Sequence, residues 1–550
     1  MDSIFYDFPY LSVLTFLPLI GALMLYLVPS FKPSSDPHGD RARMWSFFIT
    51  GLAFALSVIM FTEFVPTETG YQFVESAPWI PGFGISYTIG VDGISVLLVL
   101  LTTFLMPIIV LASPSIHSRP RGYLASMLVL QTAMIGTLVS LDVFLFYVYW
   151  ELMLAPMYFI IGIWGGKRRI YATLKFVLYT VFGSLLMLVA IFYVVWRFYE
   201  QRGEISFLLD ELVMFTNLTL KEEIWLFAAF ALAFGIKVPI FPFHTWLPDA
   251  HVEAPTGGSV ILAGVLLKMG LYGFIRFACP LFPLGAQVFA PYLIALAVIG
   301  IVYGALVAWA QDDIKKLVAY SSVSHLGYCV LGFFAGITLA GTSSTEPPNS
   351  VAAVGSVYQM LNHGISTGAL FLLVGVLYDR RHTRLIAEYG GLAAKVPVFA
   401  FLFLVFTLSS IALPLTNGFI GEFLILAGSF LAYPGVTTIA LLGVVLGAVY
   451  MLTLYMKTMY GELDEAKNGE LSDCTGREIA LFIPLLVMVF WMGLFPQKFL
   501  STIEPTMNGY MKMVQERGQA RRAFDAALNG QDKDLPATSA VASAARSSNS

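Results

Sequence analysis

The stretch ALAFGIKVPIFPFHTWLPDAHVEAPTGGSVILAGVLLKMG, residues Ala231–Gly270, places Lys237 and Lys268 inside long runs of apolar residues. Apolar segments of about 20 residues are typical of membrane-spanning helices, and such segments recur along nearly the whole chain. Between the two lysines the helical pattern is interrupted by several prolines, beginning with Pro239. Interrupted backbone inside a bilayer is tolerated only where protein or a water-filled cavity satisfies its polar groups. The sequence therefore predicts a polytopic membrane protein with a functional polar interior.

The composition agrees with a membrane protein. Hydrophobic residues make up 58% of the 550 residues and charged residues 12%, against about 25% charged in soluble domains. The formal net charge of -4 gives no reason to expect nucleic acid as a partner. Cys279, Cys329 and Cys474 lie far apart and form no CxxC pair, so the sequence does not favour a cysteine-held zinc or iron–sulfur site.

We predict an all-α membrane protein of about 14 transmembrane helices, in which the first apolar stretch, Tyr10–Val28, is retained as a span. Five regions are expected. Residues 1–120 hold spans 1–3, and residues 121–280 form a first antiporter-like repeat, with its broken helix at 224–247. Residues 281–460 form a second, inverted repeat, with its broken helix at 398–433, and residues 461–500 hold span 14. Residues 501–550 are polar and are expected to be a disordered tail.

Loop charges predict the orientation. By our count 18 lysines and arginines fall in alternate loops, including Lys167, Arg168 and Arg169, while the opposite loops carry Arg197, Arg202 and Lys221. Basic loops stay on the cytoplasmic side of a membrane. With an even number of spans, both termini are then expected on the periplasmic side.

Ionisable side chains near the middle of apolar spans are the strongest functional signal, because each costs roughly 2.5–3.5 kcal/mol on insertion scales. A structural ion pair, such as one between Glu151 and Lys237, would explain one buried charge. It does not explain several of them, because apolar residues at these positions would pack better. Glutamate, lysine and histidine together suit a proton relay. The candidate relay residues are Glu151, Lys237, Lys268, His325, His363 and Glu422.

Two of these residues stand beside helix breakers. Pro239 follows Lys237, and Pro414 precedes Glu422 about 175 residues later. Interrupted spans at corresponding positions of two halves indicate an inverted-repeat transporter. Simple proline kinks are the alternative, but their coincidence with the buried charges favours the repeat.

Several segments resemble the antiporter-like subunits of respiratory complex I, the proton-translocating NADH:quinone oxidoreductase. They are the stretch quoted above, YTIGVDGIS (Tyr87–Ser95), FYVYWELMLAPMYFIIGIWGG (Phe146–Gly166) and AQDDIKKLVAYSSVSHLGY (Ala310–Tyr328). The resemblance runs over all the expected spans, and the chain has no room for the long lateral helix of the L-type members. The stretch LPLTNGFIGEF around Glu422 departs from the family pattern at Leu415, where bacterial relatives often have glycine.

The resemblance implies roles for the six residues. Glu151 and Lys237 would form an ion pair that acts as a switch, and protons would enter near Lys237 and Lys268. They would then pass through His325 and His363 and leave by Glu422. No cofactor is expected in this chain; NADH, FMN, iron–sulfur clusters and quinone would belong to partner subunits. Expected partners are the other membrane subunits of complex I, with L-like and N-like subunits on either side, and membrane lipids. The expected location is the bacterial inner membrane.

Three alternatives remain open from sequence. A subunit of a multi-subunit Na+/H+ antiporter or of a membrane-bound hydrogenase would share the fold and the buried residues. A haem protein would use His325 and His363 as ligands, and a structural spacer would carry its charges without function. A metal site at His244, Asp249, His251 and Glu253 is disfavoured, because two histidines seven residues apart across a proline-rich loop match no zinc helix motif.

Overall fold

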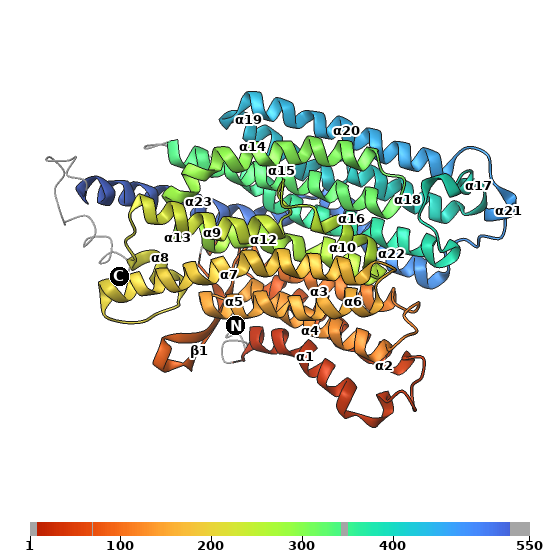
Figure 1. Ribbon diagram of the computed structural model, residues 1–550, viewed down its shortest axis with the longest axis horizontal. Helices are drawn as coiled ribbons and strands as arrows, with labels where there is room; N and C mark the ends of the chain where they lie inside the picture. The colour runs from red at the N-terminus through yellow and green to blue at the C-terminus, as the bar shows by residue number, and fades with distance from the viewer. Residues whose placement is uncertain (1–7, 69, 343–349, 529–550) are drawn as a thin grey trace.

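The computed structural model describes residues 8–68, 70–342 and 350–528. Long helices lie side by side along the longest axis of the molecule (Figure 1). The expected all-α architecture is confirmed. The helices are α1 (Tyr10–Leu27), α2 (Asp40–Glu63), α3 (Ser95–Leu111), α4 (Pro120–Val139), α5 (Val143–Leu152), α6 (Leu154–Trp164), α7 (Arg169–Arg202), α8 (Leu209–Phe215), α9 (Leu220–Lys237), α10 (Trp246–Glu253), α11 (Thr256–Ile261), α12 (Leu267–Gly273), α13 (Cys279–Leu281), α14 (Pro283–Trp309), α15 (Ile314–Thr342), α16 (Val351–Arg381), α17 (Leu392–Lys395), α18 (Pro397–Ser410), α19 (Asn417–Ala432), α20 (Pro434–Met459), α21 (Glu465–Asn468), α22 (Gly476–Leu494) and α23 (Gln497–Leu528).

Within the described ranges, eleven helical segments are long and apolar enough to cross a membrane. Helices α3, α18 and α19 are apolar but shorter than 18 residues. The span count of 14 therefore stays a prediction. The continuous helix Thr256–Leu281 contains two π-helical stretches, η3 (Leu262–Leu266) and η4 (Phe274–Ala278), on either side of α12.

The most buried helices are those that carry ionisable residues. The most apolar window of Thr256–Leu281, which contains Lys268, is 100% buried, and those of Ile314–Thr338 and Val351–Arg381 are 94% buried. These last two contain His325 and His363. Peripheral spans such as α2 bury only about a third of theirs. A helix that faces lipid leaves one side uncovered, whereas the helices with the ionisable residues are covered on all sides. These residues therefore lie in the centre of the bundle.

Both expected helix breaks are present. Helix α9 ends at Lys237, and the chain is non-helical until α10 begins at Trp246. Helix α18 ends at Ser410, and α19 begins at Asn417. Leu415 lies in this second break with φ of +78°, a left-handed conformation that costs little for glycine and about 1–2 kcal/mol for other residues. This backbone explains why glycine suits the position where the chain departs from the family pattern.

One feature of the fold was not predicted. Residues Gln72–Ile80 (β1) and Ile85–Val91 (β2) pair as an antiparallel hairpin. Gly84 turns the chain with φ of +65°. The hairpin lies with α8 at one end of the bundle, which we call the hairpin end, whereas α17 and α21 lie at the opposite end (Figure 1). Basic loops meet at that opposite end, where Arg384 donates to the Val252 carbonyl and the Arg168 amide donates to Glu253. We call it the basic end.

The prediction of a disordered tail from residue 501 is wrong up to residue 528. Helix α23 continues to Leu528, and residues 529–550 lie outside the described residues. The helix packs against α9, α14, α15 and α16. Its average composition is polar, which hid a buried stripe at helical spacing. The stripe consists of Phe499, Ile503, Met507, Met511 and Val514.

Helix α23 crosses the ends of other helices at the hairpin end. Thr506 accepts a hydrogen bond from the amide of Gly93, just before α3. Arg521 lies 3.4 Å from Glu223 in the first turn of α9. Glu223 also accepts hydrogen bonds from the amides of Leu284 and Gly285 at the start of α14. The helix therefore ties both halves of the bundle together.

A charge placed in this stripe is expected to dislodge α23. Met511→Asp should destabilise the subunit by at least about 3 kcal/mol, because it removes buried apolar contacts and buries a carboxylate. The adjacent Lys512 is exposed, so Lys512→Asp is the matched control. The measurement is the amount of subunit in the assembled membrane complex after native electrophoresis. Equal assembly of both variants would show that α23 contributes little to stability.

Candidate proton-relay site

Lys237 ends α9 where the broken segment begins. The residue lies in the last turn of the helix, where the helix dipole favours a cation. The residue is 2% exposed, and its Nζ lies 5.1 Å from the ring centre of Trp150 and 5.8 Å from that of Phe176. Among the described residues Nζ has no hydrogen-bond partner. The aromatic rings therefore stabilise the positive charge of Lys237, but no hydrogen bond from the described residues holds its protons in place.

The expected ion pair between Glu151 and Lys237 is not formed. Lys237 Nζ has no hydrogen-bond partner in the described part of the chain, Glu151 included, although the two charges interact electrostatically. Glu151 lies near the end of α5, just before the interruption at Met153 that separates α5 from α6. One of its oxygens, Oε1, is buried without a hydrogen-bond partner. Lys237 faces aromatic rings instead, so the pair is open in this structure.

Lys268 and His363 are in direct contact. Lys268 Nζ lies 2.6 Å from His363 Nδ1, and it also donates to the carbonyl of Ala263. That carbonyl belongs to the π-helical stretch η3. A π-bulge changes the backbone hydrogen-bond pattern, and such bulges are frequent at functional sites. Both side chains are almost fully buried.

His325 continues the row toward Glu422. The ring centres of His363 and His325 are 5.9 Å apart, and His325 Nδ1 lies 3.0 Å from Glu422 Oε1. The spatial order is therefore Lys268, His363, His325, Glu422. The sequence analysis placed His325 before His363, following the chain. This order is wrong because His363 on α16 contacts Lys268, whereas His325 on α15 contacts Glu422 on α19.

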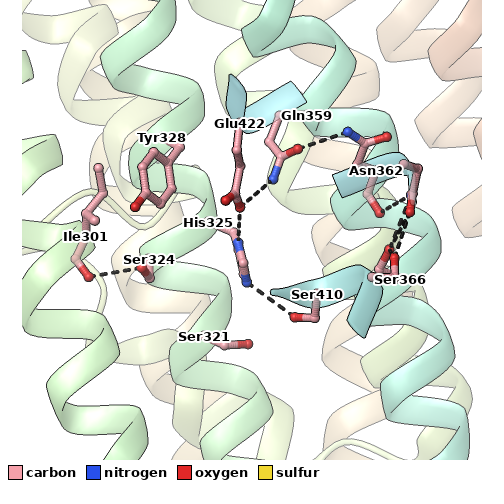
Figure 2. Close-up of polar contacts among 12 residues, drawn as sticks. Ile301, Ser321, Ser324, His325, Tyr328, Gln359, Asn362, Ser366, Ser410 and Glu422 are labelled. Carbon is pink, nitrogen blue, oxygen red and sulfur yellow. Dashed lines mark hydrogen bonds and ion pairs between the residues drawn. The ribbon is translucent and has the colours of Figure 1, made fainter. Parts of the chain in front are cut away.

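Neutral polar side chains around Glu422 were missed from sequence. Gln359 donates to Glu422 at 3.1 Å, and Asn362 donates to Gln359 at 2.9 Å (Figure 2). Figure 2 also shows Ser410 next to the second ring nitrogen of His325, at 3.4 Å. Gln359, Asn362 and Ser366 recur at helical spacing on α16, and this periodicity is the signal that could have identified them.

Close helix packing makes these contacts possible. A Cβ atom at position 421 would meet the side-chain amide oxygen of Gln359 and would lie 3.0 Å from the Gln359 Cα, so glycine there lets α19 approach α16. Further along α16, Ser366, Ser409 and Asn417 form a small hydrogen-bonded group across the second helix break. The broken backbone thus meets polar side chains instead of apolar ones.

The histidines of the proline-rich segment do not form a metal cluster in the part of the chain that the structure describes. His251 is fully buried and stacks on Phe371 with ring centres 4.6 Å apart, and neither ring nitrogen has a hydrogen-bond partner there. Asp249 is paired with Lys175 at 2.7 Å. Glu253 accepts a hydrogen bond from the amide of Arg168. Each of these groups therefore has different surroundings.

Comparisons with known proteins agree with this architecture. Residues 140–448 match the membrane-protein family described as NADH:quinone oxidoreductase/Mrp antiporter, and residues 40–139 match the amino terminus of NADH-ubiquinone oxidoreductase chain 4. NADH-quinone oxidoreductase subunit M of Rhodobacter capsulatus is 45% identical over 508 residues, covering 90% of this chain and 95% of the relative. The same subunit of Rickettsia prowazekii is 44% identical, covering 90% and 97%.

The fold is also found in a solved structure. A chain of respiratory complex I from Thermus thermophilus superimposes with a TM-score of 0.81 at 33% identity, covering 92% of this chain and 99% of that one. The resemblance inferred from motifs is therefore confirmed over most of the sequence, and the chain belongs to the family of NADH-quinone oxidoreductase subunit M.

Proposed function

We propose that this chain is a proton-translocating membrane subunit of an NADH:quinone oxidoreductase. It relays protons through Lys268, His363, His325 and Glu422. The contiguity of these four side chains carries the proposal, since a proton needs neighbouring groups that can both take it up and release it. Their central burial supports it, because a charge row inside a bilayer is costly unless it serves transport.

In this proposal Glu151 and Lys237 form the switch that drives the relay. Two opposite charges 4 Å apart interact by about 4 kcal/mol at an effective dielectric constant of 20, and by about half of that at twice the distance. Opening the pair thus removes roughly 2 kcal/mol of stabilisation from the protonated form of Lys237, comparable with the cost of about 2.3 kcal/mol for one charge crossing 100 mV. The open pair is the state in which Lys237 gives up its proton toward Lys268.

The remaining assignments belong to the same proposal. Residues 121–280 and 281–460 act as two inverted repeats, each interrupted once. Quinone reduction, with NADH, FMN and iron–sulfur clusters, takes place in other subunits, and L-like and N-like subunits flank this chain. The protein resides in a bacterial inner membrane with its basic end in the cytoplasm and both termini on the periplasmic side. The family membership and the loop charges support these points.

A haem-binding function is less well supported. Nδ1 of His325 contacts Glu422, and Nδ1 of His363 contacts Lys268. Both rings therefore already face ionisable partners at hydrogen-bonding distance. An Na+/H+ antiporter subunit remains the second candidate, because the matching family model covers Mrp antiporters.

Removing the charge of Glu422 tests the end of the relay. Glu422→Gln keeps the shape and the hydrogen bond from Gln359 but cannot take a proton from His325, so NADH-driven proton pumping should fall two- to fivefold. Acidification of membrane vesicles, followed with a pH-sensitive dye, measures the effect, and Glu422→Asp should recover most of it. Pumping by Glu422→Gln at the parent rate would remove Glu422 from the relay. Sodium-dependent pumping in the parent would favour the antiporter candidate.

A further inference from the structure

The motif YTIGVDGIS contains a buried carboxylate that the relay does not use. Asp92 lies between β2 and α3, and its Oδ1 accepts hydrogen bonds from the amides of Ile94 and Ser95, at 3.1 and 2.9 Å. Its Oδ2 lies 2.5 Å from Arg276 Nη2. Burial acts to raise the pKa of Asp92, but the Arg276 guanidinium and these amides hold that pKa below its ordinary value. The pair is therefore ionic.

Arg276 lies about two turns beyond Lys268 in the helix Thr256–Leu281, within the π-helical stretch η4. Lys268, Tyr272 and Arg276 follow one another at intervals of four residues, which places Arg276 about 12 Å from Lys268 along the helix, toward the hairpin end. Arg276 Nε donates to the Tyr272 hydroxyl at 3.1 Å, and that hydroxyl donates to the Leu138 carbonyl at 2.7 Å. The polar groups of Tyr272 and Arg276 thus lie between Lys268 and the hairpin end.

A cavity opens on the far side of Arg276. Arg276 Nη1 donates to the Tyr71 hydroxyl at 3.2 Å. Tyr71 lines an open cavity of about 410 Å³ at the hairpin end, together with Glu63, Glu68 and Glu75. This cavity, which three glutamates help to line, is therefore separated from Arg276 only by the side chain of Tyr71. It is a short route by which a proton on Lys268 would leave without passing His363.

Arginine is suited to block such a route. Its guanidinium has only N–H donors, has no acceptor, and does not release a proton in proteins. Here the donors point at Tyr272, Tyr71 and Asp92. A proton that hops along hydroxyl groups needs an acceptor at every step, and this chain offers none at Arg276. A fixed positive charge also excludes cations from a narrow path.

We propose that Arg276, held in place by Asp92, is a proton barrier that separates Lys268 from the carboxylate-lined cavity and so directs protons from Lys268 to His363. The barrier rests on the proposed relay, since it is needed only if Lys268 carries protons. The barrier explains why Asp92 of the YTIGVDGIS motif is paired with Arg276 in the protein interior, although neither residue takes up or releases a proton in the relay.

The test uses the complete enzyme complex in sealed vesicles. Arg276→Gln should let an imposed pH gradient decay at least threefold faster than in the parent and should lower the gradient sustained by NADH at least twofold, while quinone reduction continues. Arg276→Lys keeps the positive charge but can release a proton, so its pH gradient should also decay faster than in the parent, although more slowly than with Arg276→Gln. A purely structural role for the arginine predicts lost assembly or lost quinone reduction, without faster passive decay. Parental decay in assembled Arg276→Gln vesicles would overturn the proposal.

Two further variants keep the outcome decisive. If Arg276→Gln does not assemble, Asp92→Asn combined with Arg276→Gln removes both charges together and leaves no unpaired buried ion; it should leak in the same way. Adding Lys268→Met to the leaky variant should restore the parental decay, because the leak starts at Lys268. A leak that persists would contradict the proposed barrier but not the relay. Full pumping by Lys268→Met alone would contradict the relay itself.

Discussion

Lys268→Met is expected to reduce NADH-driven proton pumping at least fivefold while leaving the subunit assembled. Methionine fills a similar volume in this fully buried site but has no proton to pass to His363, 2.6 Å away. The lost hydrogen bond to the Ala263 carbonyl is internal to one helix, so its structural cost is small. Pumping and quinone reduction are measured in the same vesicles, so that a loss of coupling can be separated from a loss of turnover.

Lys268→Arg is the control that separates a relay from a structural charge. Arginine keeps the positive charge and donates hydrogen bonds, but it does not release a proton at physiological pH. If Lys268 is a carrier, the arginine variant should pump as poorly as the methionine variant. If the charge only stabilises the helix packing, arginine should restore pumping. Parental pumping by Lys268→Arg would therefore remove Lys268 from the relay.

Much of the site could be predicted from sequence because the bilayer makes charges conspicuous. Lys268, His325, His363 and Glu422 stand out in apolar spans, and the structure brings all four together. Their order in space could not be read from the chain, since it depends on which helices touch. Gln359 and its neighbours were missed for a related reason: neutral amides cost less in a membrane helix than charges and attract less notice.

Helices could be predicted from sequence where a whole segment is apolar, but not where apolar and polar residues alternate within one helix. The buried central helices and both interruptions follow from apolar runs and from prolines. Helix α23 does not, because its stripe around Ile503 and Met511 is averaged with a polar outer face. The hairpin at Gln72–Val91 lies between spans, where span hydropathy carries no information about strand pairing.

In the proposed mechanism, the open arrangement of Glu151 and Lys237 links the switch to the relay. Lys237 is held by Trp150 and Phe176 and has no hydrogen-bond partner in the residues that the structure describes. Glu151 is close enough to act on it electrostatically without contact. A small movement at the interruption after α5 or at the break after α9 would therefore change the electrostatic interaction between Glu151 and Lys237.

Glu151→Ala is expected to have the largest effect of all, a loss of at least tenfold in proton pumping and in coupled quinone reduction. Without the carboxylate nothing alternately holds and releases the charge on Lys237, so every later step loses its driving force. One Glu151 oxygen already lacks a hydrogen-bond partner within the described ranges, so its removal leaves few polar groups unsatisfied. Glu151→Asp keeps the charge at a shorter reach and should retain about half of the pumping. If alanine pumps like aspartate, the switch is wrong, and the buried charges serve structure instead of transport.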